Sequence, residues 1–235
     1  MADRLRYLAQ GAAMQLSSMD ARLRRRLGIA PEALHGVELP ERPPDSRLAR
    51  EAEELCRELS TPALLNHCLR VYVWGSLLGA RDRLRYDDEL LFVASLLHDL
   101  GLTDSFASRD GPPCFAVQGA IAAGDWGLKH GCERSRAEVV ANAISLHINP
   151  RVPPSEGVEA HLLAAGAAFD VIGARYGHLA KPLVAAAVEL HPRLGFKREM
   201  EDRSRRAAHR GPQTRVAFGY RLGFGRMIAG APFAD

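Results

Sequence analysis

The sequence predicts an all-α protein, and three observations support this. Apolar residues recur at helical spacing along most of the chain, and no convincing run of alternating β-branched residues is present. Proline, glycine and capping residues divide the periodic stretches into segments of ordinary helix length. With 235 residues, 47% of them hydrophobic, the chain is large enough for one substantial core.

Four helices are expected in the first hundred residues. They cover residues 2–27, 46–59, 62–79 and 88–99. The first is rich in charge and ends at Gly28, after which prolines and glycines up to position 45 predict an extended connection. Ser46 is a favourable N-cap, and Thr61 followed by Pro62 supplies a cap and a first-turn proline. The apolar run LLFVASLLHDLG predicts that the fourth helix is buried.

Four more helices are predicted in the second part of the chain. They cover residues 115–129, 133–148, 156–176 and 182–190. Gly101 ends the helix before them, and LTDSFASRDGPP, residues 102–113, predicts a polar loop that could cover a site. Gly131, a proline-containing stretch at 150–154 and Pro182 separate the helices. The residues after 190 mix basic side chains with GYRLGFGRMI and favour no clear assignment.

The net charge of +3 is unevenly distributed. Residues 191–235 carry ten Arg or Lys against four Asp or Glu. A basic tail can bind nucleic acid, but a recognised motif and interleaved aromatic residues are both missing. We therefore expect a solvated basic face and no nucleic-acid partner. The segment HPRLGFKR, residues 191–198, is interpreted in the same way, as a helix connection with solvated charges.

The sequence predicts a cytoplasmic protein without a membrane partner. No run of about 18 apolar residues is present, and the N-terminal MADRLRYLAQ is charged where a signal peptide is apolar. The four cysteines show no CxxC spacing, which is typical of reduced thiols. The N-terminal arm could pack on the core or on a second subunit of a homo-oligomer.

Four of the expected helices place an ionisable residue on an apolar stripe. These residues are His67, His98, His147 and Asp170, and all are predicted to point inward. A single core histidine commonly bonds a backbone carbonyl, which is the simpler interpretation of any one of them. Asp170, however, lies in AAGAAFDVIGA without a neighbouring cation, and an uncompensated buried carboxylate is costly. A shared metal ion that also binds Asp99 accounts for the whole set.

The proposed donors form a mixed nitrogen and oxygen set. Two imidazoles and two carboxylates suit one divalent ion, with Zn or Fe favoured and Mn or Co as alternatives. Such an ion lowers the pKa of bound water towards about 7 and polarises an electrophile. A two-metal site would need two further inward histidines between Asp99 and Asp170, and only His147 clearly qualifies. We therefore expect a mononuclear site.

The order of these residues resembles a known signature. His67, the His98-Asp99 doublet and Asp170 resemble the H…HD…D pattern of the HD-domain metal-dependent hydrolase superfamily. The flanking segments STPALLNHCLRVYVWG and LLHDLGLTD are similar to its cyanamide hydratase-like branch. The resemblance extends from about position 46 to the end of the chain.

This resemblance implies a domain organisation. It indicates an HD-domain helical bundle over residues 46–235 that includes a basic C-terminal extension. Residues 1–45 would then form an N-terminal helical arm and its connection. A small-molecule substrate would bind in a pocket between the helices.

The resemblance also implies roles for single residues. The metal would be held by His67, His98, Asp99 and Asp170. His147 matches a histidine position of these proteins and would act with Asp99 in catalysis, as a proton donor or by orienting water. Asn66 would orient the site or contact substrate. The ordinary alternatives are a core histidine and a polar residue at the edge of a helix face.

The chain departs from the branch at two places. Where those sequences have Ser-Phe-Glu, this chain has Cys114-Phe115-Ala116, so a carboxylate is missing. Cys68 stands where a serine is expected. The missing acid weakens the case for cyanamide itself as the substrate.

Three functions follow from these observations. The first is a mononuclear metal-dependent hydrolase or hydratase that acts on a small nitrogen-containing or nitrile-like molecule through metal-activated water. The second is a phosphohydrolase of nucleotides or phosphomonoesters, which should place several cations near the metal. Only Arg70, expected on a different helix face from His67, and the loop residue Arg109 lie close in sequence. The third is a non-catalytic metal-binding protein, which the missing acid at Ala116 favours.

Overall fold

The computed structural model describes residues 43–107 and 113–235, together with positions 11, 23, 27, 33, 34 and 37–40. It confirms the all-α prediction, because the described residues form helices and one isolated β-bridge but no strand. The α-helices are α2 (Arg47–Leu59), α3 (Pro62–Asp82), α4 (Asp88–Leu97), α5 (Phe115–Lys129), α6 (Arg134–Leu146), α7 (Val158–Ile172), α8 (Lys181–Leu190), α9 (Phe196–Arg210), α10 (Arg215–Arg221) and α11 (Phe224–Ala229). Most of the predicted helix over 2–27 and the loop tip at 108–112 lie outside the described residues.

The two N-caps predicted at the start of the bundle are confirmed. The Ser46 hydroxyl accepts a hydrogen bond from the Ala49 amide at 3.0 Å. The Thr61 hydroxyl accepts one from the Leu64 amide at 3.2 Å, and a proline occupies the first turn of α3. Each hydroxyl satisfies an amide that has no partner within its helix, so these caps set where α2 and α3 begin.

The ends of four described helices differ from the prediction by more than one residue, and one of these helices is α6, which ends at Leu146 rather than residue 148. Helix α3 continues to Asp82 rather than residue 79, and α4 ends at Leu97, which makes His98 its C-cap. Helix α7 covers Val158–Ile172 rather than 156–176, because Gly173 adopts a left-handed conformation with φ 69° and ends it. The end of α4 matters most, because it turns the His98-Asp99 doublet out of the regular helix.

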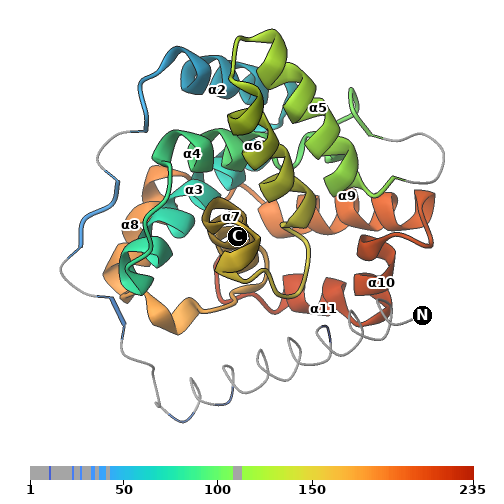
Figure 1. The fold of residues 1–235 in the computed structure, drawn as a ribbon. Helices are drawn as coiled ribbons and strands as arrows, with labels where there is room; N and C mark the ends of the chain where they lie inside the picture. The colour runs from blue at the N-terminus through green and yellow to red at the C-terminus, as the bar shows by residue number, and fades with distance from the viewer. Residues whose placement is uncertain are drawn as a thin grey trace.

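Helix α7 lies at the centre of the bundle, beside α3, α4 and α6 (Figure 1). Small residues allow this central position. A Cβ atom on Gly166 of α7 would collide with the backbone carbonyl of Val71 on α3. A Cβ on Gly75 of α3 would lie 3.2 Å from the carbonyl oxygen of Leu162 on α7. The two backbones therefore approach closely, and this brings His67 of α3 next to Asp170 of α7.

The C-terminal residues, which the sequence did not assign, form three helices with their own hydrophobic cluster. Helices α9, α10 and α11 lie together on one side of the bundle (Figure 1). Phe196, Met200, Val216, Met227 and Ile228 are buried there against residues of α3, α5 and α7. The basic C-terminal extension is thus a packed part of the fold that covers one end of the central helices.

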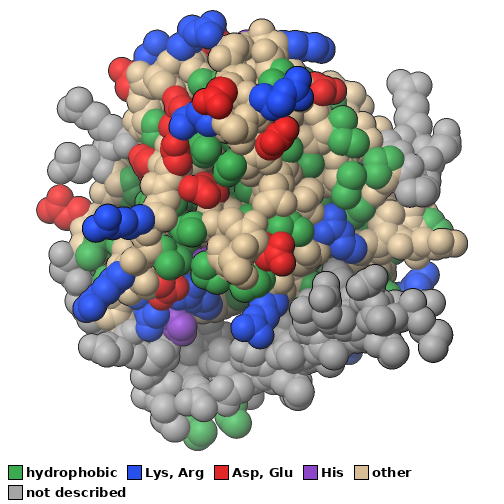
Figure 2. Space-filling model, viewed as in Figure 1, with side chains coloured by type: hydrophobic (Ala, Val, Ile, Leu, Met, Phe, Trp, Pro, Cys, Tyr) green, Lys and Arg blue, Asp and Glu red, His purple; other side chains and the backbone are tan. Residues whose placement is uncertain are grey.

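The surface carries both signs of charge. Figure 2 shows acidic and basic side chains interspersed over one face. In the described part of the chain, no helix is long and apolar enough to cross a membrane. Cys56, Cys68, Cys114 and Cys132 are all free thiols. Part of the expected extended connection is attached to the bundle, because the Leu34 amide donates to the His178 carbonyl at 2.9 Å.

The close contact between α3 and α7 can be tested with one methyl group. Gly166→Ala is expected to destabilise the protein by about 1–3 kcal/mol, because the added carbon meets backbone that has no room to move. Gly124→Ala is the matched control, since the nearest atom to its Cβ is 3.5 Å away. It is expected to be neutral or to stabilise by up to about 1 kcal/mol. Urea unfolding midpoints measure both, and equal effects would contradict the packing argument.

Candidate metal centre

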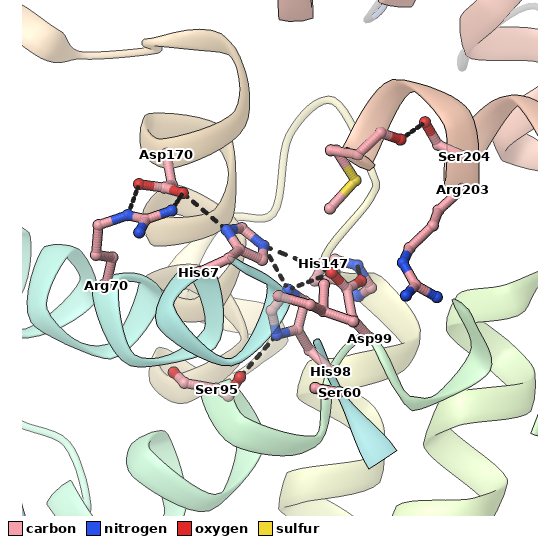
Figure 3. A network of polar contacts seen from close by, with 12 residues as sticks. Ser60, His67, Arg70, Ser95, His98, Asp99, His147, Asp170, Arg203 and Ser204 are labelled. Atoms are coloured by element: carbon pink, nitrogen blue, oxygen red, sulfur yellow. Dashed lines mark hydrogen bonds and ion pairs between the residues drawn. The ribbon is translucent and has the colours of Figure 1, made fainter. Parts of the chain in front are cut away.

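Three buried side chains direct donor atoms to one point. His67 comes from α3, His98 is the C-cap of α4, and Asp99 follows it (Figure 3). The two Nε2 atoms lie 3.2 Å apart, and Asp99 Oδ2 lies 3.5 Å from His67 Nε2 and 3.4 Å from His98 Nε2. All three donor atoms lie within 4.8 Å of one another, so they are close enough to share a metal ion.

Hydrogen bonds on the far side of each ring fix the imidazole tautomers. His98 Nδ1 lies 2.7 Å from the Ser95 carbonyl, which can only accept, so Nδ1 carries the proton. His67 Nδ1 lies 2.8 Å from the Asp170 carboxylate and donates to it in the same way. In neutral rings, the Nε2 atoms that face each other are therefore both lone-pair acceptors.

The point at which the three donor atoms meet favours a positive charge. Two lone pairs at 3.2 Å repel each other, and the buried Asp99 Oδ2 has no hydrogen-bond partner. A buried carboxylate oxygen without a partner is costly unless a positive charge lies beside it. One divalent ion relieves both problems, and two imidazole nitrogens with one carboxylate oxygen form a usual donor set for Zn or Fe. The residues present therefore fit the metal.

The charges of the cluster favour the metal-binding form of Asp99 and His98 and the protonated form of His67. Burial alone would raise the pKa of Asp99, but His98, His67 and His147 outweigh it and hold this pKa below its usual value. Burial lowers the pKa of His98, and the Asp99 carboxylate offsets only part of this. Burial also lowers the pKa of His67, but Asp170 and Asp99 raise it above the usual value overall. A proton on His67 and a metal ion are thus alternative sources of the positive charge.

Asp170 does not join the donor cluster and differs here from the four-ligand expectation. Figure 3 shows the His67 ring between Asp170 on one side and His98 with Asp99 on the other. Asp170 Oδ2 accepts from His67 Nδ1 and, at 2.9 Å, from Arg70 Nη2. Its Oδ1 accepts from Arg70 Nε at 2.8 Å, Trp74 Nε1 at 2.9 Å and Arg193 Nη1 at 3.1 Å. In this arrangement Asp170 lies on the Nδ1 side of His67, away from the three donor atoms, where it can orient the His67 ring.

The two arginines explain why a charged Asp170 is stable in the core. Burial alone would raise its pKa, but Arg70, His67 and Arg193 hold this pKa well below the usual value. The prediction that Arg70 lies on a different helix face from His67 is wrong, and Arg193 was not predicted as a partner of Asp170. Arg70 follows His67 by three residues and so shares its helix face, which the spacing could have revealed. Arg193 comes from a distant segment, and its contact with Asp170 has no signal in local sequence.

The interpretation of residues 191–198 as a connection with solvated charges is wrong for Arg193, which is only 3% exposed. Its guanidinium carbon lies 5.1 Å from the centre of the Phe196 ring. The Phe196 ring in turn stacks on His67, with 4.3 Å between ring centres. The sequence did not predict the contact of Phe196 either, which packs against the face of the His67 ring, where the ring forms no hydrogen bond.

His147 lies near Asp99 and lines the cavity beside the donor atoms. Its Nδ1 donates to the Ile144 carbonyl at 2.6 Å, and its Nε2 lies 3.8 Å from Asp99 Oδ1. Burial, together with the nearby His98, lowers the pKa of His147 to about 3, so the ring is neutral at pH 7. An unprotonated Nε2 can accept a hydrogen bond or a proton.

Two further positions that the sequence singles out, Asn66 and Ala116, are not part of the donor cluster. The Asn66 side-chain amide donates to the Pro192 carbonyl at 2.8 Å, which ties α3 to the segment before α9. Asn66 does not line the cavity next to the donors. Ala116 is fully buried in the C-terminal hydrophobic cluster and does not line this cavity either.

A cavity of about 110 Å³ opens beside the donor cluster. His67, His98, Asp99 and His147 form part of its lining, and most of the remainder is apolar. The apolar part includes Ile148, Val171, Ile172, Met200, Val216 and Met227. A small molecule bound there would contact hydrophobic side chains over most of its surface and the donor atoms of His67, His98 and Asp99 at one end.

The comparisons with known proteins agree with this geometry. The family model described as HD domain matches residues 64–208, which is more than half of the chain and lies within the predicted domain. The matched region runs from α3 into α9 and includes every residue of the donor cluster. No curated protein matches the chain.

The network behind His67 makes a testable contribution to stability. Arg70→Met is expected to destabilise the metal-free protein by about 3–5 kcal/mol, because it removes the main partner of a buried carboxylate. Adding Asp170→Asn should recover part of this loss, so the two effects are not additive. The exposed pair Arg57 and Glu53 supplies the control, since Arg57→Met should change stability by less than about 0.5 kcal/mol. Additive losses in urea unfolding would exclude the coupling.

Proposed function

The chain belongs to the HD-domain family, and on this basis we propose that it is a metal-dependent hydrolase with one divalent ion held by His67, His98 and Asp99. The observation that carries the proposal is the pair of facing Nε2 atoms beside an Asp99 oxygen that lacks a hydrogen-bond partner. Members of the HD-domain family are mostly metal-dependent hydrolases. The mixed nitrogen and oxygen donor set favours Zn or Fe.

When bound, such an ion supplies Lewis acidity and lowers the pKa of water to about 7. The chain's own residues prepare the site for it. Asp170 keeps the His67 proton on Nδ1, which leaves Nε2 as a donor to the metal. His147 presents a neutral Nε2 near Asp99 and accepts a hydrogen bond from water or substrate. The apolar cavity limits competing water around the reacting group.

The substrate we propose is a small nitrogen-containing or nitrile-like molecule, to which water is added. The resemblance to the cyanamide hydratase-like branch motivates this choice, and a cavity of about 110 Å³ suits a small molecule. Ala116 replaces the expected acid, but its side chain is buried away from the cavity. The proposed chemistry therefore relies on His147 and not on a carboxylate from α5.

A phosphohydrolase is less well supported. Phosphate recognition needs cations that face the ligand. Among the described residues that line the cavity, Arg215 is the one Arg or Lys, and it donates to Asn149 and the Ser145 carbonyl. Arg70 and Arg193 are both engaged with Asp170 behind His67. Arg109 lies outside the described residues.

Metal content and a substrate panel test the proposal together. Purified protein should contain about one Zn or Fe per chain by elemental analysis. It should hydrate at least one small nitrile or cyanamide derivative and lose this activity with a chelator. Preference for p-nitrophenyl phosphate would support the phosphohydrolase instead. Bound metal without turnover of either class would support a non-catalytic metal-binding protein.

Asp99→Asn tests the ligand assignment directly. Without the carboxylate charge, metal affinity is expected to fall at least about tenfold, and activity should fall with it. Asp125→Asn, at an exposed position on α5, is the control and should keep wild-type affinity. Equilibrium dialysis followed by metal analysis compares the variants. An Asp99→Asn protein that binds metal as tightly as the wild type would refute the assignment.

A further inference from the structure

Much of the lining of the cavity comes from helices near the C-terminus. Met200 of α9, Val216 of α10 and Met227 of α11 line it, and each of these side chains is at least nine-tenths buried. The match to the HD domain ends at residue 208, so it does not cover α10 and α11. Val216 and Met227 therefore lie outside the matched region, whereas Met200 lies inside it.

The described polar side chains that line the cavity are those of the donor cluster and His147, together with Asn149, Ser204 and Arg215. Asp99 is the one carboxylate and Arg215 the one Arg or Lys among the described residues that line it. Arg215 donates to Asn149 Oδ1 at 2.6 Å and to the Ser145 carbonyl at 2.6 Å. A cationic group that lay among Val216, Met200 and Met227 would lose its hydration with no described carboxylate beside it, which is unfavourable. Among the described Arg and Lys residues of the lining, an anionic group would meet only Arg215, whose guanidinium already bonds two oxygen atoms.

From these contacts we propose that the cavity binds an uncharged substrate with an apolar body, of about four to five non-hydrogen atoms in all. The reactive polar end would face His67, His98 and Asp99, and the body would contact Val216, Met200 and Met227. The size follows from a comparison: a buried apolar cavity of about 150 Å³ holds benzene, and this cavity measures about 110 Å³. The inference rests on the proposed function and adds a substrate class to it.

The residues also suggest how substrate length is limited. Burial of each additional methylene strengthens binding by about fourfold while space remains. Once the body reaches the far wall, a longer chain must displace packed side chains and binding weakens. Val216 is a branched, stiff side chain, so its size should set this limit more sharply than the adaptable Met200 and Met227.

A series of straight-chain nitriles tests the inference without depending on turnover. Binding of acetonitrile through heptanenitrile is measured by NMR titration, with and without added zinc. Affinity is expected to rise about fourfold per methylene until the whole nitrile has about four to five non-hydrogen atoms, as in propionitrile and butyronitrile, and then to fall. 3-Aminopropionitrile, which carries an ammonium group in place of the terminal methyl of butyronitrile, should bind at least tenfold more weakly than butyronitrile. A flat series, or equal binding of the ammonium compound, would overturn the inference.

Substitutions at Val216 test whether this side chain sets the limit on substrate length. Val216→Phe should shift the optimum to shorter nitriles by at least one carbon, and the milder Val216→Leu should weaken binding of the longer nitriles with a smaller shift. Ile121→Phe is the control, because Ile121 is 53% exposed on α5. Unfolding midpoints identify variants that fail to fold. Folded Val216 variants with an unchanged length profile would overturn the inference.

The two proposals fail in different ways. If the length series behaves as expected but no nitrile is hydrated and no metal binds, the substrate-cavity inference stands and the proposed function falls. If nitriles are hydrated without any dependence on chain length or on Val216, the proposed function stands and this inference falls.

Discussion

The hydrogen bond from His67 to Asp170 is the interaction on which the site depends. Asp170 accepts hydrogen bonds from four side chains, His67, Arg70, Trp74 and Arg193. They come from α3 and from the segment before α9, while Asp170 belongs to α7. One buried carboxylate thus joins three parts of the bundle. It also fixes the tautomer of His67, so that structural stability and the geometry of the donor cluster depend on the same contacts.

Close packing makes this interaction possible. Gly166 and Gly75 let α3 and α7 approach until their backbones touch, which places His67 within 2.8 Å of Asp170. The Phe196 ring then stacks on His67 and connects it to the C-terminal hydrophobic cluster. The donor atoms therefore lie between two hydrophobic clusters, at the end of an apolar cavity. A metal ion there would be a charge in otherwise apolar surroundings. Its interactions with nearby charged groups would be stronger than in water, because the local dielectric constant is low.

The sequence predicted the fold and much of the donor cluster because both depend on local pattern. Apolar periodicity located the helices, and the inward spacing of His67 and His98 placed two imidazoles in the core. The prediction that Asp170 is buried is confirmed, but the sequence did not predict its hydrogen bonds to Arg70 and Arg193. Arg193 reaches it only through the tertiary fold, and such a contact leaves no periodic signal. Helices α9 to α11 were missed as well, because charge on α9 and glycines at 219, 223, 225 and 230 obscure their apolar stripe.

The role of Asp170 separates this account from a four-ligand site, and a crystal structure with zinc measures it most directly. Diffraction data collected at the zinc absorption edge locate the ion from its anomalous signal. We predict one peak bonded to His67 Nε2, His98 Nε2 and Asp99, with Asp170 still bonded to Arg70 and to His67 Nδ1. A zinc ion bonded to Asp170, with Arg70 displaced from the carboxylate, would contradict the account.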